Sequence, residues 1–372
     1  MAAVPEEEVR ARVRGLRARM RRHRLGAVLL TSGPAIHYYT AFSGISIDQN
    51  ESALVVTARQ AALVTNFCYL EEAQRSAQGC EVLLRERTPV RTAAQVLRRM
   101  QVRRVGFQET ALSVRDYEDL QHIARGCRFL PWAAHAAGRR LSKSPWEVRR
   151  IRRAVRVAER AFLDLRDRIT EGMTEAQVAR ELVYLLGKHG ADAPAFPIIA
   201  ACGATASLPH VQPGRRRLRQ GGLLLVDWGA RVDHYHSDLT RVLFLGAPSR
   251  TWRERYGRVL EAHDAALRTV LAGGPVTGAE ADRTARDVLG RADLAERFGH
   301  SLGHGLGLEV HEAPQVSARN EDLLPPGAVV TIEPGVYFPR SGGIRIEDIV
   351  LVGEQRGRRL GSLPTDFDWA CL

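Results

Sequence analysis

Residues 223–244 read LLLVDWGARVDHYHSDLTRVLF, two apolar runs on either side of a polar centre. Each run is long enough for a buried strand, and the short polar link predicts an antiparallel hairpin. If Val232 and Asp233 form a two-residue turn, Asp227 lies directly opposite Asp238, with Cβ atoms about 4.5 to 5.5 Å apart. Two like charges at this separation destabilise the fold unless one is protonated or a cation lies between them.

A second pair of apolar runs repeats this design within residues 329–350. Glu333 and Glu347 interrupt the two runs, and a hairpin centred on Arg340 places them near each other, although its longer loop does not fix the register. Arg345 lies two residues from Glu347 and therefore on the same face of the strand. Because Asp and Glu are almost never buried without a partner, these strands predict a bound cation.

Between the two hairpins, residues 299–311 read GHSLGHGLGLEVH and include His300, His304 and His311. The four glycines argue against a helix and let the backbone approach a site closely. No glutamate follows His300, so the zinc-binding pattern of zincins is absent, and without a lysine a phosphate-binding loop is disfavoured. We therefore expect the three histidines to converge on the acidic residues.

Four carboxylates and one imidazole provide enough donors for two divalent cations. Oxygen-rich ligation favours Mn, and the imidazole also admits Zn or Co. Two cations about 3.5 to 4 Å apart hold a bridging hydroxide at neutral pH, which is a nucleophile for hydrolysis. Each residue alone has a structural alternative, as a surface aspartate, a salt-bridged glutamate or a core histidine. Taken together, the residues favour a metal-dependent hydrolase.

The order of five motifs resembles the metal-dependent aminopeptidase family with the pita-bread fold. The motifs are DxG from Asp227, YxSD with TR from Tyr235, GHxxGH from Gly299, TIEPG from Thr331 and GIRIED from Gly343. The Xaa-Pro members, which are Xaa-Pro aminopeptidases and Xaa-Pro dipeptidases (prolidases), match best.

This resemblance implies an α+β protein with a pita-bread catalytic domain over residues 141–372. Residues 1–140 resemble the smaller creatinase-like α/β N-terminal domain, mainly through the segment YYTAFSG at Tyr38–Gly44. Methionine aminopeptidases lack such a domain. We therefore expect the two-domain architecture of prolidases, aminopeptidase P and creatinase.

The resemblance also implies a role for each residue of the site. The implied metal ligands are Asp227 for one cation, His304 and Glu333 for the other, and Asp238 and Glu347 bridging both. The implied catalytic residues are His210 and His311, which hold the substrate and stabilise charge on the scissile carbonyl, Glu333, which manages protons, and Arg345, which orients carboxylates. His300 and Tyr337 complete the implied substrate-binding set with His210 and His311.

One loop departs from the family pattern. Cys202 and Thr205 stand where family members often carry Ser and Asn. This departure leaves the substrate preference open, and it leaves open whether a thiol near the pocket makes the activity sensitive to oxidation or is buried and inert.

The implied activity is hydrolysis of the peptide bond before proline, at the N-terminus of peptides with proline second or in dipeptides. The metal and the preferred peptide length stay open, and a homodimer is implied by the resemblance alone. Two alternatives remain. The family fold could act as a non-catalytic binding module, including for nucleic acid, or it could hydrolyse another small amide or guanidino substrate. The complete ligand set disfavours the first.

The amino-acid composition limits the possible classes of protein and partner. The 372 residues, 45% hydrophobic and 26% charged, are typical of a globular protein with two cores. The net charge of +12 could indicate nucleic acid. However, the arginine-rich helix expected at residues 8–25 also carries Val13, Leu16 and Met20 at helical spacing, which favours a solvated basic face on a packed helix. We expect no membrane segment and no secretion signal, and five cysteines without paired spacing indicate a reduced, cytoplasmic protein.

Alternation of helical and strand patterns predicts the remaining elements. The expected strands are residues 27–31, 53–57 and 61–65, and the expected later helices are residues 144–169, 174–189, 251–271 and 278–289. Residues 133–140 contain few large apolar side chains, so we expect the domain boundary there, near residue 140.

Overall fold

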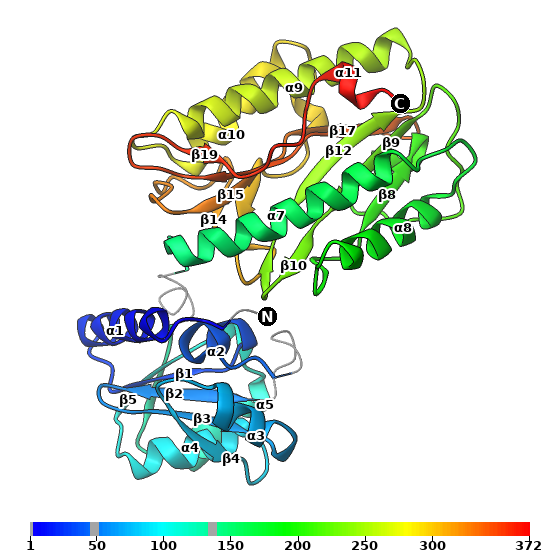
Figure 1. Cartoon of the computed structure of the whole chain (residues 1–372). Coiled ribbons are helices and arrows are strands. Elements are labelled where there is room, and N and C mark those ends of the chain that lie inside the picture. Colours follow the sequence, from blue (N-terminus) through cyan, green and yellow to red (C-terminus); the bar gives the residue numbers. More distant parts are fainter. Residues whose placement is uncertain (1–2, 45–51, 133–139) are drawn as a thin grey trace. The chain divides into compact units, whose positions relative to one another are not determined.

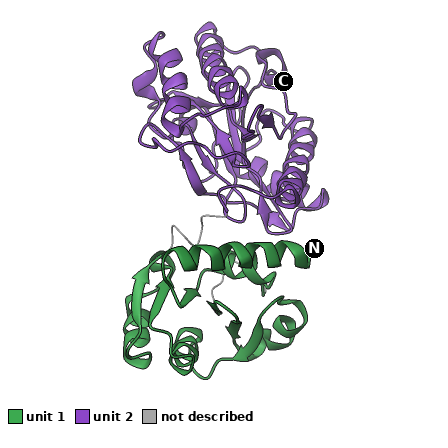
Figure 2. Cartoon of the chain, turned by 90° about the vertical axis from the view of Figure 1, so that its left-hand side faces the viewer, with its two compact units in different colours: residues 1–139 green, residues 140–372 purple. Residues whose placement is uncertain are grey.

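The computed structural model describes residues 3–44, 52–132 and 140–372. The chain divides into two compact units, Met1–Arg139 and Arg140–Leu372, which Figure 2 colours separately. The segment expected to hold the boundary lies, apart from Arg140, outside the described residues. In the described part of the chain, no helix is both long and apolar enough to cross a membrane.

The first unit is an α/β domain built on a six-stranded mixed sheet in the order β4-β3-β2-β1-β5-β6. The strands are β1 Ala27–Leu30, β2 Ala53–Thr57, β3 Ala61–Thr65, β4 Glu81–Leu84, β5 Arg104–Phe107 and β6 Arg128–Pro131. The helices are α1 Glu6–Arg22, α2 Gly33–Thr40, α3 Phe67–Ser76, α4 Pro89–Arg99 and α5 Val114–Ile123, with a short 3-10 turn at Glu109–Ala111. Three of these strands and the first helix confirm the sequence-based expectation to within three residues.

Helix α1 packs as its apolar spacing predicts. Val13, Leu16 and Met20 are buried. Most of the arginines along the helix are partly or fully exposed, although Arg12 is buried and donates to the carbonyl of Tyr38. The basic residues therefore form largely a solvated face on a packed helix.

The second unit is α+β, with curved antiparallel sheets between two pairs of helices. The helices are α7 Pro145–Arg166, α8 Glu175–Lys188, α9 Arg250–Leu271, α10 Gly278–Gly290 and α11 Phe367–Ala370. The strands before α9 are β7 Ala193–Pro194, β8 Ile199–Cys202, β9 Leu223–Trp228, β10 Ala230–Val232, β11 Tyr235–His236 and β12 Leu239–Phe244. The later strands are β13 Gly303–Gly305, β14 Glu312–Val316, β15 Val329–Ile332, β16 Gly335–Phe338, β17 Gly342–Arg345, β18 Asp348–Leu351 and β19 Arg358–Arg359.

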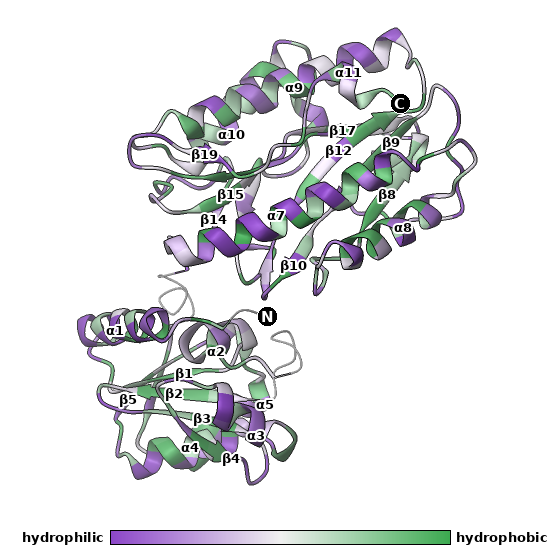
Figure 3. Cartoon of the chain, in the orientation of Figure 1, coloured by the Kyte–Doolittle hydropathy of each residue, from purple (hydrophilic) through white to green (hydrophobic). Residues whose placement is uncertain are grey.

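Helix starts follow the capping signals in the sequence. Ser144 caps α7 in a capping box with Glu147, and Thr174 and Thr277 cap α8 and α10 in the same way. Figure 3 shows hydrophilic and hydrophobic bands alternating along α7 and α9, as amphipathic helices require.

Alternation along β9 and β12 divides the core of the second unit into two layers. Leu224, Val226 and Trp228 pack with α7 and α8, whereas Leu223 and Leu225 pack with α9, α10 and the later strands. Figure 1 shows α7 and α8 on one side of these strands and α9 and α10 on the other. Asp227 has the same parity as Leu225, so it belongs to the face that meets the second hairpin.

The register predicted for the first hairpin is wrong by one position at the turn. Asp227 pairs with Thr240, not with Asp238. The turn residues are Asp233 and His234, with φ of 51° and 66°, because a two-residue turn of this kind needs positive φ at both positions. A β-branched residue such as Val232 is strongly disfavoured there, whereas Asp and His tolerate it.

The second hairpin keeps the expected register centred on Arg340. Ladder pairs Ile332 with Asp348 and Gly335 with Arg345 flank the glutamates on both sides. The register therefore brings Glu333 and Glu347 across from each other. Thr240 then forms an antiparallel bridge to Glu347, which joins the two hairpins.

Candidate metal centre

The two hairpins and the glycine-rich segment bring all five predicted ligands into one cavity of about 910 Å³ in the second unit. Each ligand comes from a strand end or the residue next to one. Asp227 lies near the end of β9, Asp238 just before β12 and His304 in β13, while Glu333 follows β15 and Glu347 precedes β18. Gly303 beside His304 permits this convergence, because a Cβ there would lie 2.0 Å from the carbonyl oxygen of Thr331.

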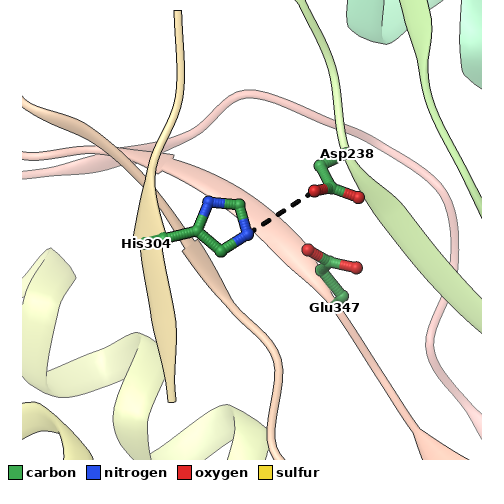
Figure 4. A group of neighbouring side chains, drawn as sticks. All are labelled: Asp238, His304 and Glu347. Carbon is green, nitrogen blue, oxygen red and sulfur yellow. Dashed lines mark ion pairs between the residues drawn. The ribbon is translucent and has the colours of Figure 1, made fainter. Parts of the chain in front are cut away.

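Three of these side chains form the centre of the cluster. Figure 4 shows Asp238, His304 and Glu347 pointing toward one another, and one ligand atom of each lies within 4.8 Å of the others. Nε2 of His304 is 3.6 Å from Oδ2 of Asp238 and 3.4 Å from Oε1 of Glu333. This is a donor set that can close around a cation.

The imidazole of His304 is oriented as a ligand. Its Nδ1 lies 3.1 Å from the carbonyl oxygen of Gly305, which fixes the hydrogen there and leaves the lone pair on Nε2. Burial, together with the neighbouring His311, lowers the pKa of His304 to about 4, so the ring is neutral at physiological pH. Nε2 therefore presents a lone pair to the carboxylates.

The four carboxyl groups are electrostatically unfavourable without a cation. Burial, and then the neighbouring Glu347, Asp227 and Glu333, raise the pKa of Asp238 well above its usual value. Burial, and then the neighbouring Glu333 and Asp227, also raise the pKa of Glu347 well above its usual range. Burial raises the pKa of Glu333 to about 7.

Asp227 supplies the clearest sign of a missing partner. Burial raises the pKa of its carboxyl even though Arg345 opposes this shift. Its Oδ2 pairs with Arg345, but its buried Oδ1 has no hydrogen-bond partner among the described residues. An unpaired buried oxygen among clustered carboxyls fits divalent cations with oxygen-rich ligation.

Arg345 and Tyr337 form the support behind the ligands. Arg345 pairs with Asp227, donates from Nε to Oγ1 of Thr240 at 3.1 Å and from a terminal nitrogen to the hydroxyl of Tyr337 at 2.8 Å. Arg345 lines the cavity, but Tyr337 is not among its lining residues. The structure therefore favours a positioning role for Tyr337 over the substrate contact expected from the sequence.

The other predicted histidines all line the cavity, in different environments. The ring of His311 lies against that of His304, with centroids 4.2 Å apart and the ring planes tilted by 55°. Nε2 of His300 lies 3.0 Å from the hydroxyl of Tyr337, and burial lowers the pKa of His300 to about 4. His210 lies on the loop after β8 and is exposed.

Two threonines and the apolar wall of the cavity were not predicted from the sequence. Oγ1 of Thr240 donates to Glu347 at 2.7 Å, and Oγ1 of Thr331 contacts Glu333 at 3.1 Å. Strand alternation could have identified both, because each lies two residues from a predicted ligand. The apolar lining residues come from separate segments of the chain that no spacing connects, and they include Phe196, Pro197, Ile199, Pro209, Val211 and Val310.

Cys202 is a structural thiol rather than a group in the pocket. It is buried and is absent from the cavity lining. Burial and the nearby Glu175 raise its pKa to about 12, so the reactive thiolate is not populated near neutral pH. The buried, inert interpretation is therefore favoured over sensitivity to oxidation.

Comparison with known proteins agrees with this geometry. Residues 149–354 match metallopeptidase family M24, and residues 12–141 match the creatinase/prolidase N-terminal domain. The chain is 42% identical to the Xaa-Pro dipeptidase of Pyrococcus horikoshii over 59% of this chain and 62% of that protein.

Two solved structures are similar over nearly the whole chain. The Xaa-Pro dipeptidase from Bacillus anthracis has a TM-score of 0.90 at 31% identity, covering 96% of this chain and 99% of that one. The X-Pro aminopeptidase from Thermotoga maritima has a TM-score of 0.87 at 30% identity, covering 95% of this chain and 98% of that one. With its creatinase-like N-terminal domain and its pita-bread catalytic domain, the chain belongs to metallopeptidase family M24.

Proposed function

We propose that this protein is a metal-dependent Xaa-Pro peptidase that hydrolyses the bond before proline in dipeptides or at the N-terminus of longer peptides. The observation that carries the proposal is the meeting of Asp227, Asp238, His304, Glu333 and Glu347 in one cavity. The names of the similar Xaa-Pro dipeptidases and X-Pro aminopeptidase support the substrate class.

The proposed cofactor is a pair of divalent cations, of which Asp227 would hold one, His304 and Glu333 would hold the other, and Asp238 and Glu347 would contribute to both. When bound, two cations supply a nucleophile from water at neutral pH and polarise the scissile carbonyl. The carboxylate-rich donor set supports Mn over Zn or Co. We also propose a homodimer, on the family resemblance alone, and a cytoplasmic location, which the five free cysteines support.

The side chains of this protein carry the remaining tasks. Glu333 lines the cavity and is the carboxylate to which we assign the acceptance and return of a proton. His210 and His311 line the same cavity and can donate to the carbonyl oxygen as negative charge develops. Arg345 holds Asp227 and Thr240, so it orients carboxylates without entering the reaction.

The test uses the full chain, stripped of metal and reloaded separately with Mn, Co or Zn. Release of the N-terminal residue is measured on Ala-Pro and on Ala-Pro-Ala, with Ala-Ala and Ala-Ala-Ala as matched peptides without proline. We expect cleavage of at least one proline peptide, dependent on added metal, and much slower cleavage of the matched peptides. No metal-dependent cleavage of either proline peptide would overturn the proposal.

A further inference from the structure

We propose that Glu175, which lies outside the cavity, is a positioning residue that sets His210 in place by joining the two ends of its loop. The consequence for catalysis rests on the function proposed above, whereas the structural coupling does not. Glu175 is the first residue of α8, and only 1% of its surface is exposed. It is absent from the residues that line the cavity.

The carboxylate of Glu175 contacts both ends of the segment that carries His210. Its Oε1 accepts the backbone N–H of Cys202 at 2.9 Å, where β8 ends, and also contacts the hydroxyl of Thr205. Its Oε2 accepts the backbone N–H of Gly214 at 3.0 Å. One buried side chain therefore closes a loop of about a dozen residues, with His210 inside it.

The first turn of α8 strengthens the same connection. The backbone N–H of Glu175 donates to the carbonyl of Arg216 at 3.0 Å, and that of Ala176 donates to the carbonyl of Gly214 at 3.0 Å. These N–H groups have no partner within the helix, so the loop satisfies them. The start of α8 thus donates backbone hydrogen bonds to the far end of the loop, and the side chain of Glu175 accepts one from it.

The tip of the loop has little support of its own. Leu208 donates to the carbonyl of Thr205 at 3.0 Å, and Pro209 and His210 lie in a turn, but in the described parts of the chain residues 209–213 make no backbone hydrogen bond of standard geometry. Pro209 and Pro213 lack the donor altogether. Ala206 is buried in the core and Val211 packs against it, so the place of His210 depends on these two contacts and on the two ends bonded to Glu175.

The geometry also requires a carboxylate rather than an amide. Two separate N–H groups approach the two oxygens of Glu175, and such charge-assisted bonds are stronger than neutral ones. A glutamine offers one acceptor oxygen and one NH₂ group, so Glu175→Gln would set a donor against either Cys202 or Gly214. One end of the loop would then lose its bond to this side chain while the side chain keeps its size.

Glu159 provides a matched control. It is also a buried glutamate that binds backbone, since it accepts from Leu363 N–H at 2.9 Å and from the hydroxyl of Ser362 at 3.1 Å. It does not line the cavity. Glu159→Gln therefore reports the cost of weakening a buried carboxylate clamp elsewhere in the same domain.

The experiment measures steady-state kinetics and amide hydrogen exchange on the metal-loaded full chain. For Glu175→Gln we expect kcat/KM on the better proline peptide to fall about tenfold, mainly through KM, with unchanged metal content. Exchange should rise in residues 203–214. Glu159→Gln should leave the kinetics and the exchange of this loop as in the parent protein. Thr205→Val, which removes one contact to Glu175, is the milder variant if Glu175→Gln folds poorly.

A double-mutant cycle with His210→Ala separates positioning from a general structural effect. If Glu175 acts through His210, Glu175→Gln has little further effect on kcat/KM in the His210→Ala background. Equal losses in both backgrounds, or unchanged loop exchange in Glu175→Gln, would overturn the inference. If the parent protein cleaves no proline peptide, the proposed function is wrong. The hydrogen-exchange measurement would still decide whether Glu175 holds the loop.

Discussion

The hydroxyl of Thr240 donates a 2.7 Å hydrogen bond to Oε2 of Glu347, and this contact joins the two hairpins that form the metal centre. The hydroxyl oxygen of Thr240 also accepts from Nε of Arg345 at 3.1 Å, and the backbone N–H of Glu347 donates to the carbonyl of Thr240 at 3.2 Å. Thr240 is also the strand partner of Asp227. One fully buried threonine thus orients groups on both sides of the site.

Replacing Thr240 by Val keeps the shape of the side chain but removes the hydroxyl. Glu347 and Arg345 each lose a buried partner, so we expect metal affinity to fall about 10- to 100-fold. Activity at limiting Mn should fall accordingly and recover at saturating Mn. Titration of the stripped protein with buffered Mn, followed by activity, measures both effects.

Thr269→Val is the control for that substitution, because Thr269 lies on α9 and its hydroxyl bonds, among the described residues, within the helix and to Thr284. It should keep the metal affinity of the parent protein. A Thr240→Val protein with unchanged Mn affinity would show that the hydroxyl does not orient Glu347.

The first hairpin shows how far strand patterns alone can predict this site. The apolar runs and the two aspartates were sufficient to expect a hairpin that gathers acidic groups. They were not sufficient for its register, because several two-residue turns fit the same pattern and only backbone φ separates them. Because the turn lies at Asp233 and His234, which have positive φ, Asp227 pairs with Thr240. The prediction of an acidic cluster survived because Asp227 and Asp238 remain on neighbouring positions of one face.

Other residues could not be predicted from the sequence, for a different reason. Glu175 contacts Cys202 and Gly214, which lie 27 and 39 positions away along the chain. No periodicity encodes such contacts, because they depend on how α8 packs against β8. In contrast, the capping signals at Ser144, Thr174 and Thr277 act within four residues, and the helix starts they predict are confirmed.

Replacing Asp238 by Asn should have opposite effects on the two metal states of the protein. It removes an expected bridging ligand, so we expect loss of metal retention and a fall in hydrolysis of at least about 100-fold. In the metal-free protein it removes one member of a repelling cluster, so the melting temperature should stay the same or rise. Metal content and thermal melts with and without Mn measure both effects.

Asp287→Asn, at an exposed position of α10, is the matched control and should change neither property. Full metal retention and activity in Asp238→Asn would contradict the ligand assignment. A clear loss of stability in the metal-free variant would contradict the repulsion inferred for the cluster.

The pH dependence of stability should differ between the metal-free and metal-loaded protein. Carboxyl groups with a raised pKa bind more protons when folded, so the free energy of unfolding falls as pH rises through the folded-state pKa. Glu333, with a pKa of about 7, and Asp238 and Glu347, whose pKa values are also raised, act in this direction. His300 and His304 act oppositely, but only between their lowered pKa of about 4 and the unfolded value near 6.5.

Above pH 6.5 the carboxyl groups therefore determine how the free energy of unfolding changes with pH. We expect the free energy of unfolding of the metal-free protein to fall between pH 6.5 and 8, with the ionisation of Glu333 alone contributing about 0.8 kcal/mol over this range. Saturating Mn should abolish the decline, because cations stabilise the ionised carboxylates. Urea unfolding at several pH values tests this, and Glu333→Gln should flatten the metal-free slope near pH 7. A metal-free protein whose stability is constant or rises over this range would contradict the assignment.

A buried network of charged groups lies behind the metal centre. Arg241 is fully buried and donates to five acceptors: the carbonyls of Thr240, Glu347, Leu363 and Pro364 and the carboxylate of Asp348. Asp348 also contacts Nε2 of His263 at 3.1 Å and Arg359 at 2.9 Å. This network lowers the pKa of Asp348, whose carboxyl is therefore ionised throughout the physiological range.

Arg241→Lys keeps the positive charge but cannot reproduce the planar guanidinium with its five donors. Several buried carbonyls and part of the Asp348 carboxylate would lose their partners, so we expect a loss of about 3 to 5 kcal/mol in the free energy of unfolding. Urea unfolding measures this loss. Arg250→Lys, at a side chain that is 92% exposed, should change stability by less than about 0.5 kcal/mol. Because Arg241 also holds the carbonyl of Glu347, Arg241→Lys should weaken Mn binding as well. If stability falls while Mn affinity is unchanged, the network supports the fold without orienting the ligand.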